Sequence, residues 1–219
     1  MSAIVLHSPF FNLYVFELWG LADSVAKKCA QVFEQCPVPE KDGYIKVDPS
    51  IHSRIASLLA EAANVKKLLT VPTKPSFKET TDQFNFRVER TTLLNEALKS
   101  PPIVELSNVE ARNSVEHFDQ YLDRAILFFS VPGRSEPGFM LYNMVLSSWE
   151  VWEGVWEGVD KKAFPLKLYV ANERKYFNLE WVADLNALHA ECSDLIARIR
   201  GIPSFGKVEG PGGLMVPVK

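Results

Sequence analysis

Apolar residues recur every three or four positions along three long stretches of the chain, and this spacing predicts amphipathic helices. The predicted helices cover about residues 8–35, 48–69 and 84–99. Proline marks their ends: Pro9 stands at the first helical position after Ser8, and further prolines follow each of the three stretches. The first half of the chain is therefore expected to be mostly helical.

A fourth helix is predicted from a capping-box pattern, with Ser107 as N-cap and Glu110 three residues later. It should continue without a break to about Phe129. On a helical wheel, an apolar arc of about 100° is expected to face the core. This arc comprises Val115, Phe118, Leu122, Ala125, Ile126 and Phe129. The opposite, polar side comprises Asn113, His117, Gln120 and Arg124. The His117 side chain is therefore expected to face water or a second surface.

A different pattern begins at about residue 133, where glycine and tryptophan become frequent. Between residues 166 and 170, aliphatic residues alternate with Lys167 and Tyr169, which is typical of a half-buried strand. We therefore expect a small β insertion over about 133–178. A last helix is predicted over about 179–200, with Gly201 just past its end.

Together these elements predict a mainly α fold, an antiparallel helical bundle with a small β insertion before the last helix. Residues 1–200 are expected to form a single domain. Residues 201–219, which are rich in glycine and proline, are expected to form a flexible tail. Hydrophobic residues make up 47% of the chain and charged residues 23%, which is enough apolar material for a core without disulfides.

The charge of the chain restricts its partners. A formal net charge of -3 and a pI of about 5.9 argue against a basic protein that coats nucleic acid. A local basic site remains open, and the pairs Lys66-Lys67 and Lys161-Lys162 are candidates for an RNA track. The chain begins without a basic leader and has no run of about 20 apolar residues, so we expect a cytoplasmic protein that does not enter a membrane.

The cysteines and histidines do not suggest a metal site or a disulfide scaffold. The chain has an odd number of cysteines, and no two of them are close in the sequence. They are Cys29, Cys36 and Cys192, and we expect three small buried thiols. The histidines are scattered, and His52 and His189 are expected at the surface or at helix ends. No metal or other cofactor is expected.

The most informative residues lie on the fourth predicted helix. Asn113 is one turn from His117, and its amide can orient the imidazole. Arg112 is displaced from His117 by about 140° around the helix axis, so a second copy of the helix across a two-fold axis would be needed to bring these groups together. In the simplest alternative, Arg112 pairs with Glu116 and His117 is an ordinary solvated histidine.

A short pattern on this predicted helix resembles the signature of the HEPN superfamily. It consists of Arg112, the polar Asn113 directly after it, and His117, with four residues between Arg112 and His117, in an all-helical context. The residues that follow, 118–123, are similar to the sequence that trails this motif in some bacterial members. The resemblance covers one helix closely and the order of the helices loosely, and it does not extend to residues 133–178. It implies a metal-independent ribonuclease that acts as a homodimer on single-stranded RNA. Some members are toxins that pair with an antitoxin-type protein.

The resemblance also implies roles for the three residues. His117 would be the general base or acid of a transesterification in which the RNA 2′-OH attacks its own phosphate. Arg112 would stabilise the charge that develops on the phosphorane, and Asn113 would orient His117 or contact the phosphate. Against this, the carboxylates of Glu116 and Asp119 flank His117 and repel a phosphate backbone.

Two other interpretations stay open. In the first, the chain is a non-catalytic helical module that binds a protein or a ligand through the same polar surface. In the second, a small-molecule pocket lies under the β insertion. Its aromatic residues would be Trp149, Trp152, Trp156 and Tyr169. The tryptophans are expected to be a packing cluster.

Overall fold

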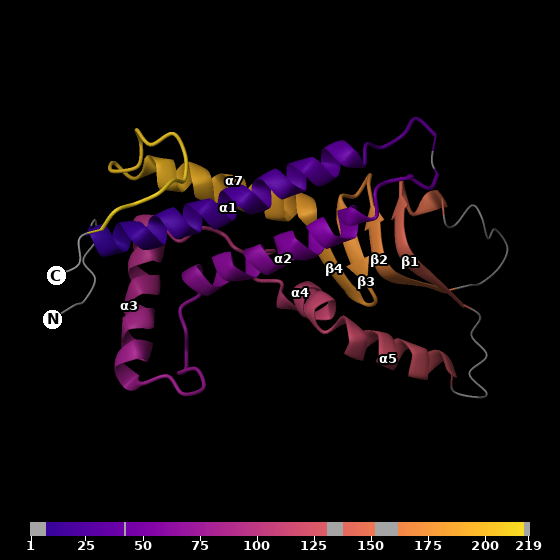
Figure 1. The fold of residues 1–219 in the computed structure, drawn as a ribbon, viewed down its shortest axis with the longest axis horizontal. Coiled ribbons are helices and arrows are strands. Elements are labelled where there is room, and N and C mark those ends of the chain that lie inside the picture. Colours follow the sequence, from indigo (N-terminus) through magenta and orange to yellow (C-terminus); the bar gives the residue numbers. More distant parts are fainter. Residues whose placement is uncertain (1–7, 42, 131–137, 152–161, 217–219) are drawn as a thin grey trace.

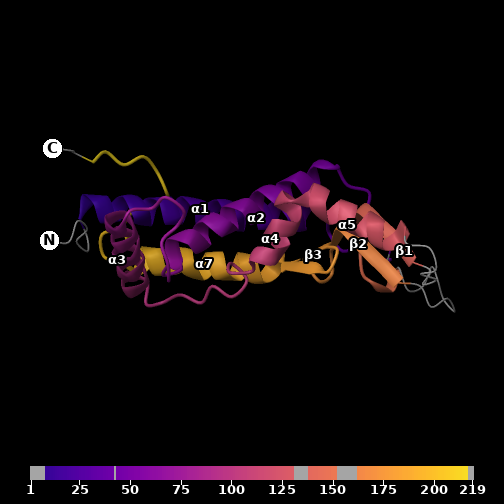
Figure 2. The ribbon, with the colours of Figure 1, turned by 90° about the horizontal axis from the view of Figure 1, so that it is seen from below.

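The computed structural model describes residues 8–41, 43–130, 138–151 and 162–216. Three long helices lie side by side along the molecule, with α1 packed against both of the others (Figures 1 and 2). They are α1 (Pro9–Gln35), α2 (Ser50–Leu69) and α7 (Leu185–Gly201). A fourth helix, α3 (Thr81–Ala97), crosses one end of this group, and a β-sheet lies at the other end (Figure 1).

Side-chain hydrogen bonds to the backbone fix the first residues of α1 and α3. The Ser8 side chain accepts the N–H of Phe11 at 3.2 Å, so the predicted start of α1 is confirmed. Helix α3 starts three residues earlier than predicted. A capping box between Thr80 and Gln83 fixes its start, because each side chain bonds the other residue's backbone N–H.

The predicted fourth helix is two helices, and the expectation of an unbroken helix is wrong. They are α4 (Val109–Glu116) and α5 (Phe118–Ser130), separated by His117 with φ -107° and ψ 37°. The prediction that Ser107 is the N-cap of this helix is also wrong. Asn108 is the N-cap, and its amide donates elsewhere, to Glu105 Oε1 and to the Val182 carbonyl.

The β part is a four-stranded sheet in the order β1-β2-β3-β4. Its strands are β1 (Gly138–Leu146), β2 (Lys162–Val170), β3 (Lys175–Asn178) and β4 (Trp181–Asp184). β1 and β2 are parallel, and the other neighbours are antiparallel. The sheet is larger than the predicted insertion and reaches residue 184.

The last helix therefore begins at Leu185, not at residue 179 as predicted. Residues 179–184 have a helix-like apolar spacing, but they turn at Leu179, where φ is 56°, and pair with β3 as β4. The Asp184 side chain then accepts the N–H of Ala187 at 2.9 Å and caps α7.

The main core lies between the three long helices and one face of the sheet. From the sheet it includes Val145, Tyr169 and Tyr176. The three cysteines are free and buried in this core, as predicted, and burial raises the pKa of each thiol. A second, smaller cluster around Leu141 and Leu168 covers the other face of the sheet. The chain is therefore mainly α, with a four-stranded sheet built onto the helices.

The segment predicted as a flexible tail starts with a turn. In that turn, Ile202 is 4% exposed and Phe205 is 1% exposed. The Phe205 ring lies 5.1 Å from Phe16 and 6.4 Å from Trp19, measured between ring centroids. The first residues after α7 thus complete the core beside α1.

Candidate functional site

The break between α4 and α5 has its cause in the sheet. The side-chain amide of Asn178, on β3, donates to the Ser114 carbonyl at 2.9 Å and to Ser114 Oγ at 3.1 Å. In an unbroken helix that carbonyl would accept the N–H of Phe118, four residues on. Asn178 is 1% exposed and takes the carbonyl instead, so the chain turns at His117.

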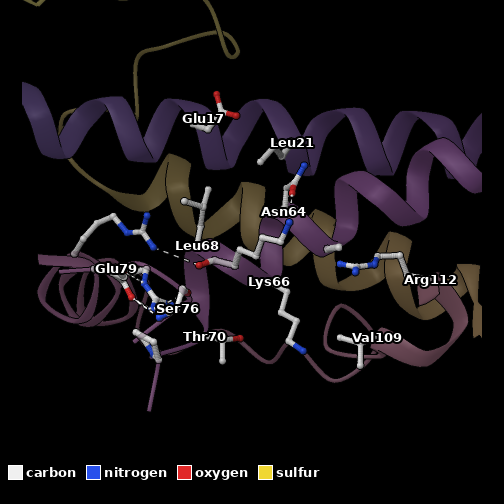
Figure 3. A pocket seen from close by; sticks show the side chains of 15 residues that line it. Glu17, Leu21, Asn64, Lys66, Leu68, Thr70, Ser76, Glu79, Val109 and Arg112 are labelled. Carbon is white, nitrogen blue, oxygen red and sulfur yellow. Dashed lines mark hydrogen bonds and ion pairs between the residues drawn. The ribbon is translucent and has the colours of Figure 1, made fainter. Parts of the chain in front are cut away.

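Arg112 is held on α4 by its neighbours. Its Nη2 lies 2.9 Å from Glu116 Oε2 and donates to Asn113 Oδ1 at 3.1 Å. Its Nε is buried without a hydrogen-bond partner among the residues that the structure describes. The side chain reaches from α4 toward Asn64 and Lys66 on α2 and lines a cavity of about 690 Å³ (Figure 3).

His117 lies at the junction and is exposed. Its backbone N–H donates to the Asn113 carbonyl at 2.9 Å, and its own carbonyl accepts the N–H of Tyr121 at 3.2 Å. Asn113 Oδ1 accepts a hydrogen bond from Arg112, and the expected bond between the Asn113 amide and the imidazole is not among the hydrogen bonds of the described residues. Within the described ranges, no hydrogen bond joins the Arg112 and His117 side chains.

The surroundings of the junction are of mixed charge. Lys167, on β2, holds its Nζ 4.1 Å from the centroid of the Phe118 ring, directly after His117 in the chain. Lys167 has a φ of 56°, and its backbone N–H donates to Asn178 Oδ1 at 3.2 Å. A cation that sequence reasoning did not single out is thereby placed next to the junction.

A cavity lies beside Arg112. It lies between α1, α2, α3, the segment that joins α2 to α3, and the start of α4 (Figure 3). Its basic residues are Lys66, Lys67, Arg87, Arg90 and Arg112, and its acidic residues are Glu17 and Glu79. An acidic chain therefore carries one concave surface with an excess of cations.

Part of this surface could be anticipated from the sequence. The Lys66-Lys67 pair, a candidate for an RNA track, does lie in the same cavity as Arg112. Arg87 and Arg90 were missed, although their spacing of three residues places both on one face of α3. For the second lysine pair, Lys161 lies outside the described residues, and Lys162 is the first residue of β2.

The structure also bears on the predictions for His52 and for the aromatic residues of the β insertion. His52 is not at the surface: it is 6% exposed, its ring lies 6.1 Å from Tyr176, and burial lowers its pKa to about 4. Trp149 packs edge-on against Phe177 at 5.1 Å, as expected for a packing role. Trp152 and Trp156 lie outside the described residues, and the Tyr169 side chain is fully buried in the main core.

In the part of the chain that the structure describes, no three His, Cys, Asp or Glu side chains are grouped where they could hold a metal ion. None of the described helices is long and apolar enough to cross a bilayer.

Comparisons with protein-family models, curated proteins and solved structures gave no match.

Proposed function

We propose that this chain is a HEPN-type endoribonuclease that cuts single-stranded RNA without a metal, at a site completed by a second copy of the chain. The observation that carries the proposal is the position of the Arg112, Asn113 and His117 motif. It lies where α4 ends, with the imidazole exposed at the junction and the guanidinium facing a basic cavity. Both groups are thus accessible to a phosphate backbone.

The reaction follows from what these groups can do. A His117 imidazole takes the proton of an RNA 2′-OH, whose oxygen attacks the adjacent phosphorus. The P–O5′ bond breaks, and the leaving oxygen takes up the proton that the His117 imidazolium now carries. The products are a 2′,3′-cyclic phosphate and a 5′-OH. Arg112 stabilises the extra negative charge on the phosphorane through its N–H donors.

The separation of Arg112 and His117 within one chain is the reason for a second copy. In a two-fold dimer, the Arg112 of one copy can approach the His117 of the other, and the same pairing occurs twice. Helix α5 offers an apolar surface next to the junction, where Ile126 is 49% exposed and Leu127 is 68% exposed. Apolar surface of this kind is typical of subunit contacts.

The test is cleavage of a single-stranded RNA in EDTA. Wild-type protein is expected to cut it, and His117→Ala is expected to lose at least about a hundredfold in rate because general acid–base catalysis is removed. Gln120→Ala is the matched control, since Gln120 is exposed one turn away on α5. Equal rates for wild type and His117→Ala, or no cutting by either, would refute the proposal.

A second candidate function is favoured by one observation. The Arg112 guanidinium is already paired with Glu116 and Asn113, which reduces its availability for a transition state. The same surface would then bind a protein partner of the antitoxin type without cutting RNA. This alternative predicts no cleavage by any variant and a defined partner that His117→Ala still retains.

A further inference from the structure

Two neighbouring strands have an unusual backbone conformation at the same level of the sheet. The φ angle is 57° at Asn143 on β1 and 56° at Lys167 on β2, a left-handed conformation that few residues other than glycine adopt. The pairing of the two strands is regular up to Tyr142 and Leu166 and resumes two residues later. Backbone strain of this kind is concentrated at binding and catalytic sites, so the side chains around it are candidates for a function.

The buried Asn178 side chain couples Lys167 to the junction between α4 and α5. Its Oδ1 accepts the Lys167 N–H at 3.2 Å, and its Nδ2 donates to the Ser114 carbonyl at 2.9 Å. The first bond holds the strained residue of β2, and the second takes the carbonyl at which the helix breaks before His117. The positions of Lys167 and His117 are therefore fixed through one residue.

The Lys167 ammonium lies near two aromatic rings and has no counter-charge beside it. Its Nζ is 4.1 Å from the centroid of the Phe118 ring and 6.0 Å from that of Tyr142. None of the ion pairs between described residues includes Lys167. An ammonium held in this way keeps N–H donors for an anion that arrives from outside.

Tyr142 adds an aromatic surface that the core does not use. It lies on β1, at one edge of the sheet, and is 55% exposed. A cation beside an exposed ring is the pairing that proteins use for single-stranded nucleic acid, because the phosphate meets the cation while a base stacks on the ring. The exposed imidazole of His117 directly precedes Phe118 in the chain, so this surface adjoins the proposed site of cleavage.

We propose that Lys167 and Tyr142 hold the RNA strand beside His117, with a phosphate on the Lys167 ammonium and a base on the Tyr142 ring, a role that rests on the ribonuclease function proposed above. Both are positioning residues, since they hold the strand and exchange no proton with it. Both also lie in residues 133–178, which the HEPN resemblance does not cover, so the sheet has a function of its own. A base inside a duplex has no free face for Tyr142, and this surface therefore selects single strands.

The experiment measures binding by fluorescence anisotropy, with the full chain in EDTA and a labelled single-stranded RNA whose 2′-hydroxyls are methylated to prevent cleavage. Lys167→Ala is expected to weaken binding about tenfold, because one charge-assisted contact is lost, and Lys167→Arg should restore most of it. Its salt dependence, as the slope of log K against log salt, should fall by about 0.7. The matched control is Lys207→Ala, since Lys207 is exposed after α7, at the end of the molecule opposite to the sheet (Figure 1).

The ring is tested by a second pair of variants. Tyr142→Ala should also weaken binding about tenfold, whereas Tyr142→Phe keeps the stacking ring and should bind as the wild type does. A duplex of the same sequence should bind more weakly than the single strand. Because Tyr142 is exposed, neither variant is expected to disturb folding.

Cleavage of the unmodified strand separates this proposal from the ribonuclease itself. Lys167→Ala and Tyr142→Ala should raise KM with little change in kcat, because binding is lost and proton transfer is not. Binding with these losses but without cleavage supports the sheet surface and refutes the ribonuclease. Cleavage with an unchanged KM in both variants overturns the sheet surface and leaves the ribonuclease intact. The sheet surface is also overturned if wild type does not bind the methylated RNA, or if both variants bind it as tightly as Lys207→Ala.

Discussion

At the scale of single residues, the cap of α1 and the small buried thiols were visible in the sequence, whereas the partner of the buried Asn178 was not. Ser8 and Pro9 start α1 as expected, because a cap depends only on its neighbours. Asn178 could not be recognised, since its partner Ser114 is 64 residues away in the chain. His52 could have been found: it lies three and seven residues before Ile55 and Leu59, on the apolar face of α2.

Replacing Asn178 tests the cause of the helix break. Asn178→Ala is expected to lower the free energy of unfolding by about 2 kcal/mol, because the buried Ser114 carbonyl and the Lys167 N–H lose a partner. The measurement is urea unfolding. Asn172→Ala is the control, since Asn172 is exposed in the neighbouring turn and should change stability little. Equal stability of the two variants would contradict the proposed role of Asn178.

The buried His52 makes stability depend on pH. Burial, with a smaller contribution from the charge of Lys167, lowers its pKa in the folded state from 6.5 to about 4. The unfolded chain therefore takes up this proton first, and stability present above about pH 6.5 is lost as the pH falls toward 4. The loss should be roughly 3 kcal/mol.

His52→Gln, which does not titrate, should remove this step from the free energy of unfolding measured in urea between pH 8 and pH 4. An unchanged pH profile in the variant would show that His52 is not the group responsible.

At the scale of elements, the long helices were predictable and the β4 strand was not. Each of α1, α2 and α3 carries a 3.6-residue period with proline near its ends, and such a pattern depends only on local sequence. Residues 179–184 fit a helix equally well by period, and only their pairing with β3 decides for a strand. The helix break at His117 belongs to the same class, because contacts distant in sequence override a local preference.

The start of α3 gives a test at this scale. Thr80→Ala removes one half of the capping box with Gln83 and is expected to lower the free energy of unfolding by about 1 kcal/mol. Thr73→Ala, in the exposed loop before α3, should have almost no effect. Thermal or urea unfolding of both variants distinguishes them, and a larger loss for Thr73→Ala would contradict the capping role.

At the scale of the whole molecule, an acidic chain concentrates cations in one place. The net charge of -3 argues against a protein that is basic throughout. It could not reveal that helices α2, α3 and α4 bring together lysines and arginines from distant parts of the sequence. Of the motif residues, Arg112 faces this cavity and His117 is exposed at the junction. We propose that two copies of the chain bring these two side chains together.

The most direct measurement of this central proposal is complementation between two inactive variants. Arg112→Ala and His117→Ala proteins, each inactive alone, are mixed in equal amounts, allowed to exchange subunits, and assayed for RNA cleavage in EDTA. Each mixed dimer has one intact pairing of Arg112 from one copy with His117 from the other. The mixture should therefore recover about a quarter of the wild-type rate and produce 2′,3′-cyclic phosphate ends. A mixture that forms mixed dimers but stays as inactive as the separate variants would contradict a site shared between two copies.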